Sequence, residues 1–98
     1  MALRVRRTPR AAADLLALWI YIADNSEAAA DRMLDAIEET LAMLANYPRA
    51  GRLRSEISNG LRSFPVGRYI VFYRTTLTDL VLTRILGTAQ DIDAIEFE

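Results

Sequence analysis

The sequence contains no cysteine, no histidine and no lysine. The missing cysteine and histidine exclude disulfide scaffolds, zinc sites of the usual Cys/His kind, thiol nucleophiles and any catalytic triad that uses imidazole as its base. The missing lysine excludes Schiff-base chemistry and the phosphate-binding P-loop. We therefore expect no metal, no cofactor and no small-molecule substrate.

Long apolar runs are missing as well. No stretch approaches the roughly 18 residues of a membrane-spanning helix, and the arginine-rich first ten residues are not followed by the apolar core of a signal peptide. We expect a cytoplasmic protein without membrane contact. The 98 residues, 52% of them hydrophobic, suffice for one hydrophobic core, so residues 1–98 are predicted to form a single domain.

The net charge of −1 hides a segregated distribution of charge along the chain. Residues 11–48 carry seven acids against one arginine, whereas residues 49–74 carry six arginines against one acid, and residues 88–98 add four acids. These blocks predict an acidic helical layer and a basic second half that can steer an acidic partner, protein or nucleic acid. The overall neutrality argues against general nucleic-acid binding.

The first half of the sequence has the pattern of a strand followed by two helices. Leu3 to Arg6 alternates apolar and charged residues, and Thr8 before Pro9 is typical of a helix start. The first helix is expected over about residues 9–24, and the second begins after the N-cap Ser26 and ends at the stretch 47–51. We expect the two helices to form an antiparallel hairpin.

The apolar face of the first helix is wider than a surface helix requires. Its predicted members are Ala12, Leu15, Leu16, Trp19, Ile22 and Ala23. Leu18 and Ile20 flank this face and widen it, so part of it can serve as a surface for a partner. The acids of the second helix, Asp31, Asp35, Glu38 and Glu39, are expected to form a solvated face.

From residue 52 onward the hydrophobic periodicity is that of β-strands. Short strand-like runs lie at 53–57, 61–66, 69–74 and 78–86. The run 69–74 is largely apolar on both faces, as in a central strand that is covered on each side. Tyr69, Val71 and Tyr73 point one way, and Ile70 and Phe72 the other. Helices can cover only one of these faces, so the other needs the C-terminal segment, a bound partner or both. This β-α-α-β-β-β layout with antiparallel strand pairing predicts a two-layer α+β fold.

The ordered motifs of the second half resemble the ParE-type toxins of bacterial type II toxin–antitoxin systems, within the RelE/ParE superfamily. The motifs are YPRAGR at 47–52, RSE at 54–56, GLRSFPVGRYIVFYR at 60–74 and RILGTAQDI at 84–92. Asp14-Leu15 and Tyr21-Ile22-Ala23 extend the resemblance over nearly the whole chain. It implies a twisted antiparallel sheet with the helical hairpin on one face and a short C-terminal segment. It also implies a hetero-oligomer with a ParD-like antitoxin that wraps the toxin and makes the only contact with operator DNA.

The ParE branch of this superfamily is described as acting on DNA gyrase, whereas the RelE branch cleaves mRNA on the ribosome. RNA cleavage requires groups that take and give a proton, together with cations that stabilise the developing charge. Lys and His are absent here, and Gly87 stands where many relatives have His. This favours inhibition of gyrase by binding, without catalytic residues. If the chain is a nuclease, the candidate groups are Glu56, Arg54, Arg62, Tyr73 and Arg84.

An inactive toxin homologue, acting only as an antitoxin or repressor partner, is a third possible function. For antitoxin binding, the candidate residues are Leu16, Trp19, Ile20, Arg62, Tyr73 and Arg74. For gyrase binding, they are Arg74, Arg84, Ile92, Ile95 and Phe97. Trp19 has two possible roles, core packing under the sheet or anchoring the antitoxin.

Arginines in the strands need a partner or access to solvent. Arg84 shares the strand parity of Leu80 and Leu82, and pairing with Glu56 or with the acidic tail is an alternative to a role in gyrase binding. For Arg62 and Arg74 too, structural pairing is an alternative to a role in binding. Three other arginines are expected to be solvated: Arg52, Arg54 and Arg68. The tail 91–98 is expected to fold back over the exposed sheet face with Ile92, Ile95 and Phe97 inward, the alternative being a frayed terminus.

Overall fold

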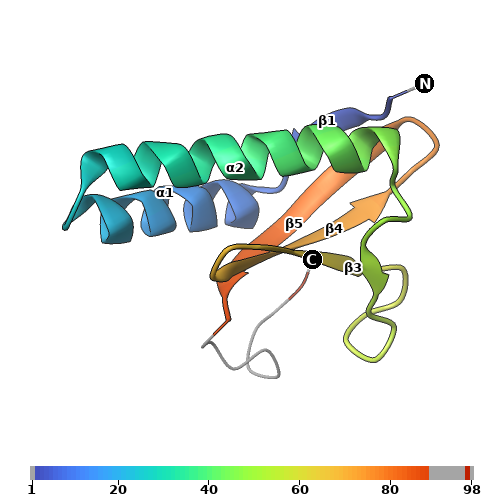
Figure 1. Cartoon of the computed structure of the whole chain (residues 1–98). Coiled ribbons are helices and arrows are strands. Elements are labelled where there is room, and N and C mark those ends of the chain that lie inside the picture. Colours follow the sequence, from blue (N-terminus) through green and yellow to red (C-terminus); the bar gives the residue numbers. More distant parts are fainter. Residues whose placement is uncertain (1, 89–96, 98) are drawn as a thin grey trace.

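Two helices pack side by side on one face of a five-stranded sheet (Figure 1). The computed structural model describes residues 2–88 and 97. The elements in chain order are β1 (Arg4–Arg7), α1 (Pro9–Ala23), α2 (Glu27–Asn46), β2 (Arg52–Leu53), β3 (Arg62–Val66), β4 (Tyr69–Thr75) and β5 (Asp79–Gly87). The predicted α+β fold, with a strand, a helical hairpin and then the remaining strands, is confirmed.

Both helices begin where the sequence predicts. The Thr8 hydroxyl accepts a hydrogen bond of 3.1 Å from the N–H of Ala11, and the Ser26 hydroxyl accepts one of 3.1 Å from the N–H of Ala29. Each cap satisfies a backbone donor that has no partner within its own helix. Within the described part of the chain, neither helix combines the length and apolar character needed to cross a membrane.

The strand order is β1-β5-β4-β3-β2, and the sheet is mixed rather than wholly antiparallel. β2 to β5 pair antiparallel in chain order, whereas β1 pairs parallel with β5. The expectation of a wholly antiparallel sheet is wrong for β1, because that rule holds for consecutive strands joined by short turns and both helices lie between β1 and the other strands. Two ion pairs stabilise the pairing of β1 with β5. The carboxylate of the buried Asp79 lies 2.8 Å from Arg6 Nε and 3.4 Å from Arg4 Nε.

The first predicted run of the second half, 53–57, is mostly not a strand. β2 contains only Arg52 and Leu53, and the chain then turns through residues 54–60. The backbone of Arg54 stabilises these turns. Its N–H donates to the carbonyl of Leu61 at 2.7 Å, and its carbonyl accepts the N–H of Ile57 at 3.0 Å.

The helical face of the sheet holds the larger part of the core. β4 and β5 contribute Val71, Tyr73, Leu80, Leu82 and Ile85, and α2 contributes Ile37, Leu41 and Leu44. The buried residues of α1 are Ala11 and Leu18, whereas Ala12 and Leu16 are exposed. The predicted face of α1 is therefore wrong at these positions. An apolar arc this wide does not fix which part of it turns toward β5.

The opposite face of the sheet has its own small core around Phe72. Leu61 and Leu86 are buried with it, and Ile57 and Ile70 pack against them. The ring of Phe97 meets that of Phe72 edge-on, with centroids 4.7 Å apart. The inward position expected for Phe97 is therefore confirmed, while Ile92 and Ile95 lie outside the described residues.

A register shift changes the predicted position of Arg84. Tyr73 lies opposite Leu82, but its neighbour Phe72 lies opposite Arg84, so Thr83 is an extra residue in β5. Because Phe72 and Tyr73 face opposite sides of the sheet, the backbone register of Arg84 differs from that of Leu82, although its guanidinium still reaches Asp14 of α1 at the edge of β5 beyond the end of β1. The expected parity is wrong for this reason.

Asp14 of α1 binds the bulged part of β5. Its carboxylate accepts Nε and Nη2 of Arg84 at 2.7 and 3.0 Å and the backbone N–H of Ile85 at 3.0 Å. The Asp14 and Arg84 side chains are only 16% and 12% exposed, so both charges need this pairing. One carboxylate thus holds α1 on the sheet and satisfies a backbone donor of β5 beyond the end of β1.

Replacing Asp14 should therefore destabilise the fold. We expect Asp14→Ala to lower the free energy of unfolding by roughly 2–4 kcal/mol, because Arg84 and the Ile85 N–H lose their shared acceptor. Urea unfolding followed by circular dichroism measures this. The control is Glu39→Ala on the exposed side of α2, for which a change below about 0.5 kcal/mol is expected; equal stability of the two variants would contradict the role of Asp14.

Candidate functional site: a groove between the two helices

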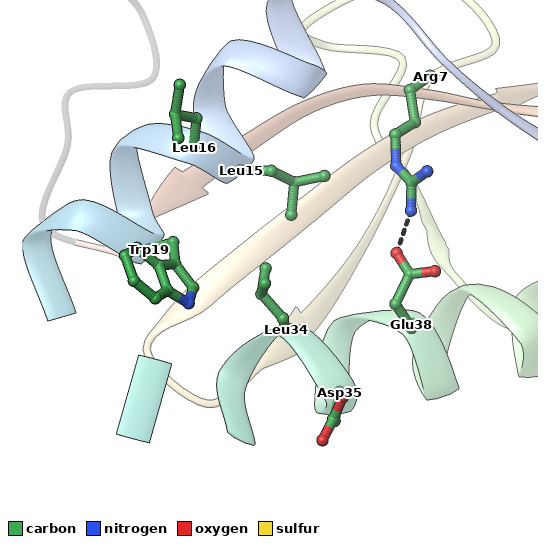
Figure 2. A pocket seen from close by; sticks show the side chains of 7 residues that line it. All are labelled: Arg7, Leu15, Leu16, Trp19, Leu34, Asp35 and Glu38. Atoms are coloured by element: carbon green, nitrogen blue, oxygen red, sulfur yellow. Dashed lines mark hydrogen bonds and ion pairs between the residues drawn. The ribbon is translucent and has the colours of Figure 1, made fainter. Parts of the chain in front are cut away.

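A groove runs between α1 and α2 next to the end of β1 (Figure 2). Its volume is about 520 Å³. Seven side chains from three elements line it: Arg7, Leu15, Leu16, Trp19, Leu34, Asp35 and Glu38. The groove combines a mainly apolar surface with charged residues at one side, the composition expected of a site for an amphipathic segment.

The apolar part of the groove comes from both helices. Leu15 and Leu34 point toward one another across it, with Trp19 beside them (Figure 2). Leu16 is 63% exposed and Ile20, one turn further along α1, is 57% exposed. The structure thus brings together three residues predicted to bind the antitoxin, Leu16 and Trp19 in the groove and Ile20 on the adjoining surface of α1.

The polar part of the groove comes mainly from acids of α2. Glu38 forms an ion pair with Arg7, and Asp31 accepts a hydrogen bond of 2.9 Å from the indole N–H of Trp19. Trp19 is half-buried and its one polar atom is satisfied, so the ring is held in a fixed position at the groove. The α2 acids are exposed as predicted, but their contacts with Arg7 and Trp19 were missed, because helical periodicity carries no information about the neighbouring element.

Tyr73 and Arg62 hold the chain segment that follows α2. The buried Tyr73 hydroxyl donates to the carbonyl of Pro48 at 2.7 Å and accepts the N–H of Gly51 at 3.0 Å. Arg62 Nη1 donates to the carbonyl of Gly51 at 2.9 Å. A side chain at position 51 would overlap the Tyr73 hydroxyl, so this close approach requires glycine.

This placement corrects the role predicted for Tyr73. Its side chain is 0% exposed and its hydroxyl has two partners within the chain, so it offers a partner protein no surface and RNA no accessible proton-transfer group. Burial raises the pKa of the Tyr73 hydroxyl, against the smaller opposing effects of the Gly51 hydrogen bond and the Arg62 charge.

Arg54 lies on the opposite face of the sheet, and the expectation that its side chain is solvated is wrong. Its guanidinium carbon lies 6.0 Å from the centre of the Phe72 ring, and its nitrogens reach Glu56 at 2.8 Å and Ser63 at 3.2 Å. The hydrogen bond from Arg54, followed by one from the backbone, lowers the pKa of the exposed Glu56 carboxyl. Arg52 and Arg68 are exposed as predicted.

The nuclease candidates do not meet in one place. Arg62 and Tyr73 are opposite each other in the sheet and face the helical side, whereas Arg54 stacks on Phe72 on the other side. Arg84 is paired with Asp14 of α1, and Glu56, one of its two expected partners, is bound by Arg54 instead. Arg74, a candidate for antitoxin and gyrase binding, reaches Ser58. The residues described here include no group of three or more acids that could hold a metal ion.

Comparisons with known proteins agree with this architecture. Residues 5–92 match the family model described as the ParE toxin of the type II toxin–antitoxin system parDE. Toxin ParE3 of Caulobacter vibrioides is 35% identical over 92 residues, which are 93% of this chain and 92% of that protein.

Two solved structures are similar over most of the chain. One is a chromosomal ParDE system from P. aeruginosa, with a TM-score of 0.72 and 21% identity, covering 88% of this chain and 96% of that one. The other is the toxin–antitoxin complex RelBE2 from Mycobacterium tuberculosis, with a TM-score of 0.65 and 30% identity, covering 89% and 99% respectively.

The Tyr73 hydroxyl gives a prediction with a pH dependence. Tyr73→Phe leaves the Pro48 carbonyl and the Gly51 N–H without their buried partner, so we expect a loss of about 1–3 kcal/mol in the free energy of unfolding at neutral pH. The pKa of this hydroxyl is higher in the folded chain than its ordinary value of 10.0. The neutral hydroxyl therefore makes its full contribution to the free energy of unfolding at pH values below 10.0, and this contribution is lost as the pH rises through the pKa of the folded chain.

Urea unfolding of the wild type and of Tyr73→Phe, at neutral pH and at about pH 11, measures both effects. The difference between the two proteins should shrink at the higher pH. An equal difference at both pH values would contradict the predicted preference for the neutral hydroxyl.

Proposed function

The chain belongs to the ParE toxin family of type II toxin–antitoxin systems, and we propose that it inhibits DNA gyrase by binding and that a ParD-like antitoxin neutralises it. Family membership supports the target, since the ParE branch is the one described as acting on gyrase. The missing lysine and histidine support inhibition without catalysis.

The strongest structural support for a binding mechanism is the separation of the nuclease candidates. A ribonuclease must place its proton-transfer groups and its cations around one phosphate. Here the Tyr73 hydroxyl is buried in a backbone contact on one side of the sheet, and Glu56 is bound by Arg54 on the other. Inhibition by binding requires no such convergence.

RelE-like cleavage of mRNA is retained as the second candidate because the RelBE2 complex is 30% identical to this chain. One pair of assays separates the two functions. The purified chain should block supercoiling by gyrase at concentrations that leave translated mRNA intact, and addition of the antitoxin should restore supercoiling. Cleavage of mRNA on the ribosome, with gyrase unaffected, would place the chain in the nuclease branch. A chain without either activity that still binds its antitoxin would be an inactive homologue.

The groove between the helices is the proposed site for the antitoxin. Its leucines and Trp19 fit the apolar face of an amphipathic helix, and such helices bind grooves through residues spaced three or four apart. The acids of α2 at its side would meet a positive charge on the bound segment. Trp19 is the expected anchor, because a half-buried tryptophan of fixed orientation is the type of residue that dominates binding energy.

A charge placed in the groove should weaken binding of the antitoxin. We expect Leu16→Glu to raise the dissociation constant by about 30-fold or more, because it buries a carboxylate next to the acids of α2 on binding. The control is Leu77→Glu at a position that is 99% exposed, for which no change is expected. Isothermal titration calorimetry with the purified antitoxin measures both, and equal affinities would show that the antitoxin binds elsewhere.

A further inference from the structure

The side of α1 opposite its buried residues is apolar over most of the length of the helix. Five exposed residues spaced three or four apart form this side: Ala13, Leu16, Ala17, Ile20 and Tyr21. Tyr21 is 76% exposed. The buried residues of α1, Ala11 and Leu18, lie on the other side of the helix. We call the five exposed residues the α1 stripe.

No charged residue interrupts the α1 stripe. The only charged residue between Arg10 and Asp24 is Asp14, and its carboxylate is bound by Arg84 and by the backbone of β5. A helix that is apolar on nearly all sides is normally a buried helix. Contiguous apolar surface that stays exposed marks a site of contact with another protein.

The groove between the helices accounts for only one flank of this surface. Of the five residues, Leu16 alone lines the groove. The two alanines and Tyr21 lie further round the helix, so the proposed antitoxin site does not explain why they are apolar. Another partner is needed for the rest of the α1 stripe.

The α1 stripe is complementary in shape to a second copy of itself. Two α1 helices can pack antiparallel about a two-fold axis between residues 16 and 17. Ile20 of each copy then lies opposite Ala13 of the other, because these two positions are equally far from the axis, and the two Leu16 side chains meet beside it. A large side chain thus meets a small one, as close packing of two helices requires.

The charges at the two ends of the α1 stripe favour the same arrangement. Arg10 lies one turn before Ala13, and Asp24 lies one turn after Ile20. Antiparallel packing brings Arg10 of one copy next to Asp24 of the other, whereas parallel packing would place like charges side by side. Both residues are exposed, and Arg10 also has a contact within its own chain, so these pairs orient the helices more than they add affinity.

We propose that the α1 stripe is an interface between two copies of this chain, which pair through antiparallel α1 helices. This pairing goes beyond the proposed function and does not depend on it. Because Leu16 belongs both to the α1 stripe and to the groove, a paired copy cannot hold the antitoxin, and this consequence rests on the proposed antitoxin site. Two helices of 15 residues make a small interface, so we expect a dissociation constant of roughly 10–100 µM.

Sedimentation equilibrium of the full chain, from about 5 to 300 µM, tests the pairing. The average mass should rise from the 11.0 kDa of one chain toward twice that value. Ala13→Glu places a carboxylate against Ile20 of the second copy and should keep the chain monomeric throughout. The control is Ala42→Glu at an exposed position of α2, which should associate like the wild type. Circular dichroism and urea unfolding show that both variants are folded.

Exchange of the end charges tests the antiparallel arrangement. Arg10→Glu and Asp24→Arg each place like charges at both ends of the pair and should raise the dissociation constant at least about threefold. The double variant restores opposite charges and should return to within about twofold of the wild type. Each substitution agrees with the dipole of α1, an acid near its N-terminus or a base near its C-terminus, so neither is expected to unfold the helix.

A single cysteine tests whether pairing and antitoxin binding exclude each other. The chain has no cysteine of its own, so Ala17→Cys places one thiol next to the two-fold axis. An added oxidant should join the thiols of two copies in a disulfide, and excess antitoxin should prevent this covalent dimer. Ala42→Cys is the matched control and should give no covalent dimer.

The outcomes separate the pairing from the proposed function, because sedimentation uses the toxin alone. A mass of 11.0 kDa at every concentration, or a dimer that Ala13→Glu leaves intact, would overturn the inference. Single charge variants that associate as tightly as the wild type would overturn the antiparallel arrangement. A covalent dimer that persists with excess antitoxin would reject their mutual exclusion. Pairing by a chain that does not inhibit gyrase would reject the proposed target and support the interface.

Discussion

The fold depends on the need to cover β4 on both faces. Val71 and Tyr73 point to one side and Phe72 to the other, and all three are 0% exposed. The helical hairpin covers one side only, so the second side is closed by Leu61 and Leu86 with the ring of Phe97 against Phe72. Layers on both sides of the sheet meet this requirement, because burial of apolar surface is the main driving force of folding and β4 can reach full burial only between two layers.

Polar contacts then fix what apolar burial leaves undetermined. Asp14 binds Arg84 and the backbone of β5 to α1, and Asp79 pairs with Arg4 and Arg6 of β1 at the edge of the sheet. The Tyr73 hydroxyl extends from the core to hold the segment after α2. These groups are buried or half-buried, where a polar group without a partner is costly. Asp79 Oδ1 is an exception, because it has the Arg4 ion pair at 3.4 Å but no hydrogen bond.

The sequence predicted most of the fold and part of the site. Periodicity and caps located both helices, and the alternating residues of β4 were assigned to the correct faces. Leu16, Trp19 and Ile20 were expected at a partner surface, and the structure places the first two in the groove and the third beside it. The roles of Arg54 and Arg84 were not predictable, because a turn after Leu53 and a single extra residue at Thr83 decide where these side chains go. The face of Tyr73 was predicted, but its contacts with Pro48 and Gly51 were not, because those residues lie far away in the sequence.

The sequence by itself determined the class of fold, the resemblance to ParE toxins and the exclusion of histidine, lysine and cysteine chemistry, because each depends only on residue type and order. The tertiary structure alone decided that β1 pairs parallel with β5, that the nuclease candidates are divided between the two faces of the sheet, and that Tyr73 holds the segment after α2 rather than facing a partner. These outcomes depend on contacts between residues far apart in the chain, such as Asp14 with Arg84 and Pro48 with Tyr73, and local periodicity does not encode such distances.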